Sequence, residues 1–337
     1  MANIALRNPQ FKSIAIPSTG FLSTVCTVRI DGTLRYTLIK NVQPSTTINF
    51  DIAELARDYI EIAYQSNYVP QTVAVQTILT NYSGLNGTGS PSLTGEQYDD
   101  IGFEAYGIFE EEINPEVPFG RSLPTYLIPP DNNNIPLATP AFTILAPNNV
   151  GGRLISLSSL NTITATPYTG SDTSVTSDGI VCNIKRIDCT KYGEGKKITY
   201  INKYGVQQDL WFFLKETKNL ARTNEGYKSN TITYPSGGAE YNVQNAPNKV
   251  FNTQAKQTHS LSSGYYPEFA NEQFEELLLS EYVWFHKPTS GVGVGSYIVV
   301  PVKVKTSSVA FKTSVNDRLI EYTMEFEEAF DYINNIR

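Results

Sequence analysis

The chain has 337 residues, of which 40% are apolar and 18% charged, and its formal net charge is −7. This length is sufficient for two domains, each with a hydrophobic core of its own. A protein that binds free DNA or RNA carries clustered Lys and Arg side chains that neutralise phosphates. This chain is acidic overall and has no such cluster. We therefore predict no direct nucleic-acid recognition.

The composition favours strands over helices. Tyr (21) and Phe (16) are abundant, and together with recurring Thr, Val, Ser and Asn they suit half-buried strands joined by polar turns. The first residues lack the apolar segment of a signal peptide, and no apolar run approaches the roughly 18 residues of a membrane-spanning helix, so we predict no membrane span. Three cysteines fit no zinc spacing and no disulfide framework, and we interpret them as small buried apolar residues. They are Cys26, Cys182 and Cys189.

The first half of the chain is predicted to form strands around one helix. Asp31-Gly32 joins two candidate strands, 24–30 and 35–39, and this dipeptide favours a tight hairpin turn. Residues 51–64 are expected to form an amphipathic helix capped by Asp51, because Glu54 occupies the capping-box position and apolar residues recur at helical spacing. Residues 81–96 have the composition of a surface loop.

A run of Thr, Ser, Gly and Asp at 167–178 separates the two halves. We predict a β-rich N-terminal domain over 1–170, with a Pro- and Asn-rich extension at 115–168, and a β-rich C-terminal domain over 179–337. In the second half, 197–201 and 209–215 are expected to form a hairpin, and four consecutive apolar residues at 211–214 predict a strand that is buried on both faces. Residues 223–249 are predicted to be a polar loop. The fold class expected is mainly β with a few short helices, in two β-sandwich or β-barrel-like domains.

The stretch from Tyr265 to Arg337 is predicted to organise the C-terminal half, with a helix at 271–280 and strands at 281–285, 296–305 and 318–327. The last two strands alternate between apolar and charged positions. The apolar positions are Ile320, Tyr322, Met324 and Phe326, opposite Glu321, Thr323 and Glu325, and Ile298, Val300, Val302 and Val304, opposite Lys303 and Lys305. The Lys and Glu faces can pair within the chain or between subunits, and pairing within the chain is the simpler expectation.

Glycine-rich residues 290–295 resemble a nucleotide-binding loop only superficially. A dinucleotide loop follows a strand and opens a helix, whereas these glycines lead into a strand. We interpret the loop as a hairpin tip that contacts another protein, together with the charged faces of the last strands. The candidate interface residues are Lys287, Gly291, Gly293, Gly295, Lys303, Lys305, Glu321 and Glu325.

The sequence offers little material for catalysis. Only two histidines are present, His259 and His286, and no G-x-S-x-G nucleophile turn occurs. Carboxylate pairs such as Glu275-Glu276 are adjacent in sequence, which is typical of solvated faces, although a hydrolase of unrecognised class remains an alternative. We predict no catalytic, metal-binding or cofactor-binding residues, and no enzymatic activity.

The order of several segments resembles tail-tip or baseplate structural proteins of tailed bacteriophages. The resemblance covers most of the chain as an order of elements and is closest over the last seventy residues. The segments are RNP (7–9), FDIAELARDYIE (50–61), FEAYGIFEE (103–111), KKITYINKYGVQQDLWFFLK (196–215), FEELLLSEYVWF (274–285) and the C-terminal residues 301–337, which begin PVKVK.

This resemblance implies a virion protein of the tail, with tail-tube-like or hub-like β-domains and assembly in the host cytoplasm. It implies a ring homo-oligomer, hexameric or trimeric, that bridges the tail tube to a hub or to receptor-binding fibres. A different class also remains open, a receptor-binding or carbohydrate-binding β-module, because Tyr, Asn and Trp of the kind found at binding surfaces are present and two polar loops are predicted, at 81–96 and 223–249.

Overall fold

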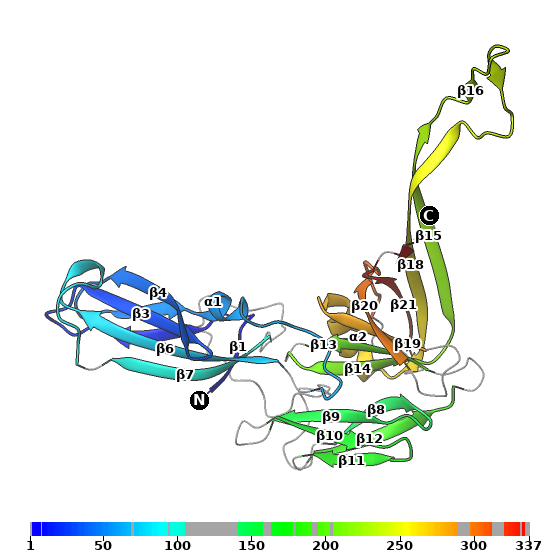
Figure 1. Ribbon diagram of the computed structural model, residues 1–337. Coiled ribbons are helices and arrows are strands. Elements are labelled where there is room, and N and C mark those ends of the chain that lie inside the picture. The colour runs from blue at the N-terminus through cyan, green and yellow to red at the C-terminus, as the bar shows by residue number, and fades with distance from the viewer. Residues whose placement is uncertain are drawn as a thin grey trace.

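The computed structural model describes residues 2–7, 9–68, 71–93, 95–104, 141–157, 163–177, 180–189, 195–202, 205–288, 297–311, 320–330 and 332–333. Strands dominate these ranges and only two α-helices occur in them, which confirms the prediction of a mainly β protein. Figure 1 shows an elongated N-terminal lobe, a C-terminal body with small sheets beside it, and a two-stranded arm that projects from the body. No sheet closes into a barrel within the described ranges.

Two sheets and a short helix build the N-terminal lobe. Its elements are β1 (Ala2–Ala5), β2 (Phe11–Ala15), β3 (Ser23–Ile30), β4 (Thr33–Asn41), β5 (Thr47–Asp51), α1 (Ala53–Arg57), β6 (Thr72–Tyr82), the 3-10 turn η1 (Leu85–Gly87) and β7 (Glu96–Phe103). The larger sheet has the order β1-β7-β6-β3-β4, and β2 pairs with β5. Buried side chains from both sheets and from α1 share one core, which includes Ile14, Val28 and Ala56.

The turn between β3 and β4 forms as predicted. Asp31 and Gly32 both have positive φ, 48° and 78°, as the two central residues of a type I′ turn require. The carboxylate of Asp31 also accepts a hydrogen bond from the backbone N–H of Ala74 at 3.0 Å. This bond ties the turn to β6, the next strand of the sheet.

The first helix is much shorter than predicted. Asp51 does accept a hydrogen bond from the backbone N–H of Ala53, at 3.1 Å, so the predicted start is nearly correct. However, α1 ends at Arg57, and residues 61–65 have no regular secondary structure. The aromatic and β-branched residues that follow Arg57 have modest helix propensity, and the chain beyond them instead contacts the C-terminal body.

Residues 141–187 form two small sheets. The strands are β8 (Ala141–Pro147), β9 (Gly152–Leu157), β10 (Ile163–Tyr168), β11 (Ser174–Ser177) and β12 (Ile180–Ile187). β9 and β10 pair with each other, while β12 lies parallel to β8 and antiparallel to β11. β8 precedes residues 171–178 and β12 follows them, so two strands that pair with each other lie on opposite sides of the predicted boundary. The division into domains 1–170 and 179–337 stays a prediction.

An eight-stranded antiparallel sheet dominates the C-terminal body. Its strands are β13 (Lys196–Ile201), β14 (Gln207–Phe212), β15 (Glu216–Lys228), β18 (Asn248–Tyr266), β19 (Val283–Pro288), β20 (Tyr297–Val304), β21 (Ile320–Glu328) and β22 (Tyr332–Ile333). They follow the order β14-β13-β19-β20-β21-β18-β15, with β22 also on β18. The 3-10 turn η2 (Glu268–Ala270) leads into α2 (Asn271–Leu279), whose Phe274 packs edge-to-face on Phe212 with 6.1 Å between ring centroids.

The patterning of this sheet agrees with the sequence at two places. Trp211, Phe212 and Phe213 are all buried, so the run of apolar residues is covered on both faces as predicted over its first three residues, whereas Leu214 is half-buried and β14 ends at Phe212. Along β21, the four predicted apolar positions are buried, whereas Glu321 and Glu325 are exposed.

Ion pairs and hydrogen bonds join the lobe to the body. The guanidinium of Arg7 contacts Glu104 at 2.7 Å and Glu281 at 2.6 Å, and Arg57 contacts Glu104 at 2.9 Å. Further along, the phenol of Tyr68 donates to Asp209 at 2.8 Å. These contacts explain why the chain leaves α1 early, since residues 64–68 lie on the surface of the large sheet.

Candidate interaction surface

The described residues contain no group of His, Cys, Asp or Glu that could hold a metal ion. Among the described helices, none has the length and apolarity needed to cross a membrane. Cys26, Cys182 and Cys189 are free and buried, which confirms their interpretation as small core residues. The search for a functional site therefore turns to surfaces.

The structure separates the predicted interface residues. Lys287 donates to Glu328 at 2.8 Å, and Lys305 pairs with Glu327 at 3.0 Å, so both lysines have partners within the chain. Lys303 is exposed on β20. Gly291, Gly293 and Gly295 lie outside the described residues.

Glu321 and Glu325 lie on the exposed face of β21. Glu321 accepts a hydrogen bond from the hydroxyl of Ser262 at 2.5 Å, and Glu325 is paired in register with Ser260. Both residues lie beside β18, and Glu321 has a polar partner within the chain. A role of these residues in contacts with another protein stays a prediction.

The most distinctive surface is the arm, which the sequence did not indicate as a strand pair. β15 and β18 continue together far beyond the rest of the sheet, and a tip of two short strands, β16 (Ile232–Thr233) and β17 (Glu240–Tyr241), closes the arm (Figure 1). Along β18, the exposed fraction rises from 0% at His259 and 8% at Ala255 to 63% at Phe251. A single strand thus passes from the core of the body into open solvent.

Exposed apolar side chains are concentrated on this arm. Of the large hydrophobic residues that are exposed in the described chain, eight lie between 217 and 257. They are Leu220, Tyr227, Ile232, Tyr234, Tyr241, Val243, Val250 and Phe251. Soluble monomers expose single apolar residues freely, but a concentration of them marks a surface that contacts something else.

Three of the exposed residues form what we call the aromatic patch: Tyr227, Lys249 and Phe251. Tyr227 lies opposite Lys249 in the strand register, and the rings of Tyr227 and Phe251 are 6.3 Å apart between centroids. A β-bulge between Glu225 and Gly226 shifts the register here. Phe251 lies two residues from Lys249 along β18, so the ordinary alternation of side chains places both rings on the same side of the arm.

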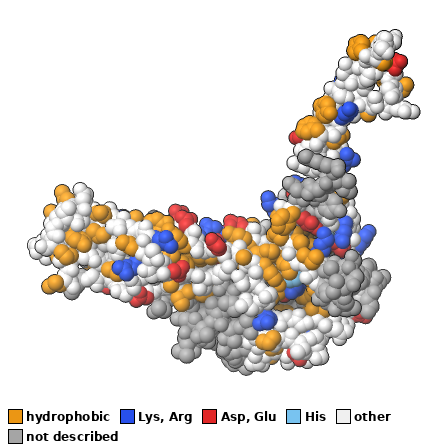
Figure 2. Space-filling model, viewed as in Figure 1, with side chains coloured by type: hydrophobic (Ala, Val, Ile, Leu, Met, Phe, Trp, Pro, Cys, Tyr) orange, Lys and Arg blue, Asp and Glu red, His pale blue; other side chains and the backbone are white. Residues whose placement is uncertain are grey.

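The arm is basic while the rest of the chain is acidic. Residues 217–257 contain five Lys or Arg and two Glu, a net charge of +3, which leaves −10 for the remainder. Lys256 pairs with Glu327 near the base of the arm. Arg222, Lys228 and Lys249 form no ion pair with any described carboxylate. Figure 2 shows basic and hydrophobic side chains together along the arm.

The base of the arm is anchored by a buried histidine. The ring nitrogens of His259 lie 2.8 Å from Glu216 and 2.9 Å from Glu328, so each nitrogen has a carboxylate partner. Burial raises the pKa of the Glu216 carboxyl, but the hydrogen bond from His259 and the charges of nearby lysines outweigh it and hold this pKa below its usual value. This anchor links β15, β18 and β21.

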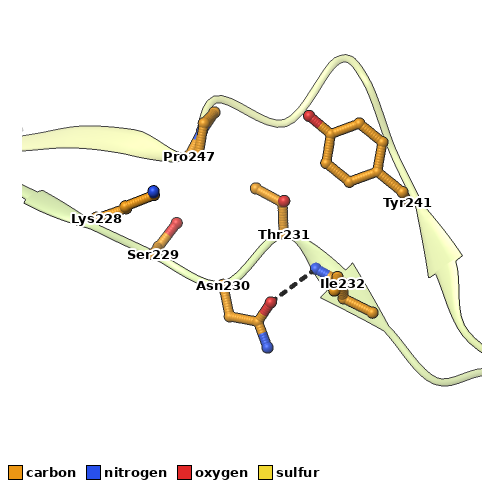
Figure 3. A pocket seen from close by; sticks show the side chains of 7 residues that line it. All are labelled: Lys228, Ser229, Asn230, Thr231, Ile232, Tyr241 and Pro247. Carbon is orange, nitrogen blue, oxygen red and sulfur yellow. Dashed lines mark hydrogen bonds between the residues drawn. The ribbon is translucent and has the colours of Figure 1, made fainter.

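A hollow of about 400 Å³ lies where the arm meets its tip. Figure 3 shows Ser229, Thr231 and Tyr241 pointing into the space between the two strands. Below it, Asn230 accepts a hydrogen bond from the backbone N–H of Ile232 at 3.0 Å. The hollow combines hydroxyl groups with one aromatic ring, and it is open to solvent.

The sequence pattern does not predict the arm because the strands of the arm bury almost none of their side chains. Strands are recognised from alternation between a buried and an exposed face, and residues 217–228 are exposed on both faces. The one available indication was the turn-forming run Pro235-Ser236-Gly237-Gly238, which lies midway between two segments of similar length.

Comparison of the chain with known proteins gave no matching family model, no matching curated protein and no matching solved structure.

Proposed function

We propose that the chain is a structural virion protein that forms a ring or adaptor at the tail end of a bacteriophage, where it joins the tail tube to a hub or to receptor-binding fibres. The observation that carries this proposal is the arm, in which β18 leaves the core and exposes Phe251 and its neighbours. A lone two-stranded ribbon has little stability of its own in water. Such a ribbon is useful chiefly when another molecule covers it.

The virion setting comes from the resemblance of the sequence to tail-tip and baseplate proteins. In that setting the partners are further copies of the chain, in a hexameric or trimeric ring, and the tube, hub or fibre proteins of the tail. Assembly would take place in the host cytoplasm, and the chain would act as a structural component rather than an enzyme.

Electron microscopy of the purified protein, alone and mixed with purified tails, tests this function. We expect a closed oligomer, or one that forms when a tail partner is added, located at the distal end of the tail. A stable monomer that never joins purified tails would exclude the proposal.

A second candidate is a receptor-binding or carbohydrate-binding module of the virion. The tip of the arm favours it, since Tyr234 and Tyr241 are 76% and 60% exposed and aromatic rings with one free face suit the apolar faces of sugars. Binding of the isolated protein to glycan arrays or to host cells would support this candidate. Loss of that binding in Tyr234→Ser and Tyr241→Ser, but not in Tyr265→Ser on the body, would locate it at the tip.

A further inference from the structure

We infer that the aromatic patch of the arm docks on a second copy of this chain, against the acidic surface where the lobe of that copy meets its body. The inference deepens the proposed function and rests on it for its setting, because it names the partner that covers the arm. Its physical basis is the apolar content of the patch, its charge, and the distribution of acidic residues on the remainder of the chain.

The apolar part of the argument concerns Tyr227 and Phe251. Both rings are more than half exposed, and they already contact each other, so little rotational freedom would be lost when a partner covers them. Aromatic residues that are held in place by their own strand pair are typical anchors of protein interfaces. Beside them, the outer edge of β15 pairs with no strand of the described ranges, which leaves backbone groups available to the same partner.

The electrostatic part identifies the partner as a copy of the same chain. The arm has a net charge of +3 and the remainder −10, so the arm of one copy is attracted to the body of another. Lys249 lies within the aromatic patch and has no described carboxylate partner. Complementary charge of this kind steers association and fixes the orientation of docking.

Most of the acidic excess lies on two segments that meet at the joint between lobe and body. Residues 51–61 carry four acidic residues and one Arg, and residues 268–281 carry five Glu and no Lys or Arg. Arg57 and Glu281 bring these segments to within 3.7 Å of each other. All four acidic side chains of the first segment are exposed: Asp51, Glu54, Asp58 and Glu61. Figure 2 shows acidic side chains gathered where the lobe meets the body.

Sedimentation velocity of the full chain, over a range of protein and salt concentrations, tests the inference. The wild type should associate, and more weakly as salt rises. Tyr227→Ser combined with Phe251→Ser should weaken association roughly 100-fold, and Lys249→Glu roughly tenfold. The matched controls alter the opposite side of the arm: Val250→Ser should associate as the wild type does, and Lys228→Glu, which changes the net charge of the arm as much as Lys249→Glu does, should weaken association much less than Lys249→Glu. Circular dichroism melting of each variant verifies that it is folded.

Complementary charge reversal locates the receiving surface. The triple variant Glu54→Lys, Asp58→Lys, Glu61→Lys should associate weakly alone, and its mixture with Lys249→Glu should associate more tightly than either variant alone. The inference is overturned if the wild type remains monomeric at every concentration, if the patch variants associate like the controls, or if mixing restores nothing.

The outcomes separate this inference from the proposed function. If wild type and patch variants alike bind purified tails while remaining monomeric in solution, the tail function stands and docking between copies is wrong. If the chain associates through the aromatic patch but never binds tails, docking between copies stands and the tail function is wrong.

Discussion

At the scale of single residues, the two histidines of the chain have opposite surroundings. His286 lies beneath residues 64–68, and burial together with the nearby charge of Lys197 lowers its pKa to about 4. The hydroxyl of Thr199 donates to Asp209 at 2.6 Å, so the His286 ring, 2.8 Å from the same hydroxyl, is the donor in that contact. His259, in contrast, lies between two carboxylates.

His286 makes stability depend on pH. In the unfolded chain this ring is protonated below about pH 6.5, whereas in the folded chain it stays neutral until the pH falls to about 4. Stability is therefore full above pH 6.5 and falls as pH decreases toward 4, by about 2 kcal/mol between pH 8 and pH 5. Urea unfolding at these two pH values should show a smaller decrease for His286→Gln. An equal decrease in both proteins would contradict the assignment.

His259 stabilises the base of the arm. Its replacement by Ala leaves Glu216 and Glu328 partly buried without their shared donor, and should lower the free energy of unfolding by about 3 kcal/mol. Lys256→Met on the same strand removes only an exposed pair with Glu327 and should cost less than about 1 kcal/mol. Denaturant titrations of both variants provide the comparison, and equal losses would argue against a special role for the histidine.

At the scale of elements, the sequence predicted strands that bury a face and missed those that do not. The Asp31-Gly32 hairpin, the buried run at 211–213 and the alternation of β21 all follow from local chemistry. The helix predicted for 51–64 is wrong over its second half, because contacts of residues 64–68 with the body outweigh helical periodicity. The arm and the joint depend on residues far apart in the chain, such as Arg7 and Glu281, and no local pattern reveals them.

The tip of the arm should be dispensable for folding. Backbone N–H of Ser229 donates to the carbonyl of Pro247 at 2.7 Å, so deleting 231–245 and replacing Ala246 with Gly and Pro247 with Thr leaves an Asn-Gly turn between two residues that can form both hydrogen bonds of a closed pair. We expect the free energy of unfolding to change by less than about 0.5 kcal/mol. Docking between copies should persist, while any binding of glycans at Tyr234 and Tyr241 should disappear.

At the scale of the whole molecule, the contacts at the joint fix the orientation of the lobe relative to the body. Arg7 is nearly buried and bridges Glu104 of the lobe and Glu281 of the body. The hydrogen bond from Arg7 lowers the pKa of Glu281 below its usual range. Since the acidic surface proposed to receive the arm spans this joint, its shape depends on the same contacts.

Arg7→Met tests the joint. The substitution leaves buried Glu104 with Arg57 as a remaining cation, and should lower the free energy of unfolding by about 3 kcal/mol. Small-angle scattering should also show a broader distribution of distances, because the lobe gains freedom relative to the body. Arg29→Met removes an exposed Arg on β3 and should change neither measurement.

The central claim is that the arm is covered by another copy of the chain when the protein assembles. Hydrogen exchange of the wild type, compared between dilute and concentrated protein, measures this coverage directly. We predict slower exchange on assembly at the arm, over 217–228 and 248–254, together with slower exchange near 51–61. An assembled protein in which the arm exchanges as fast as in the monomer would contradict the claim.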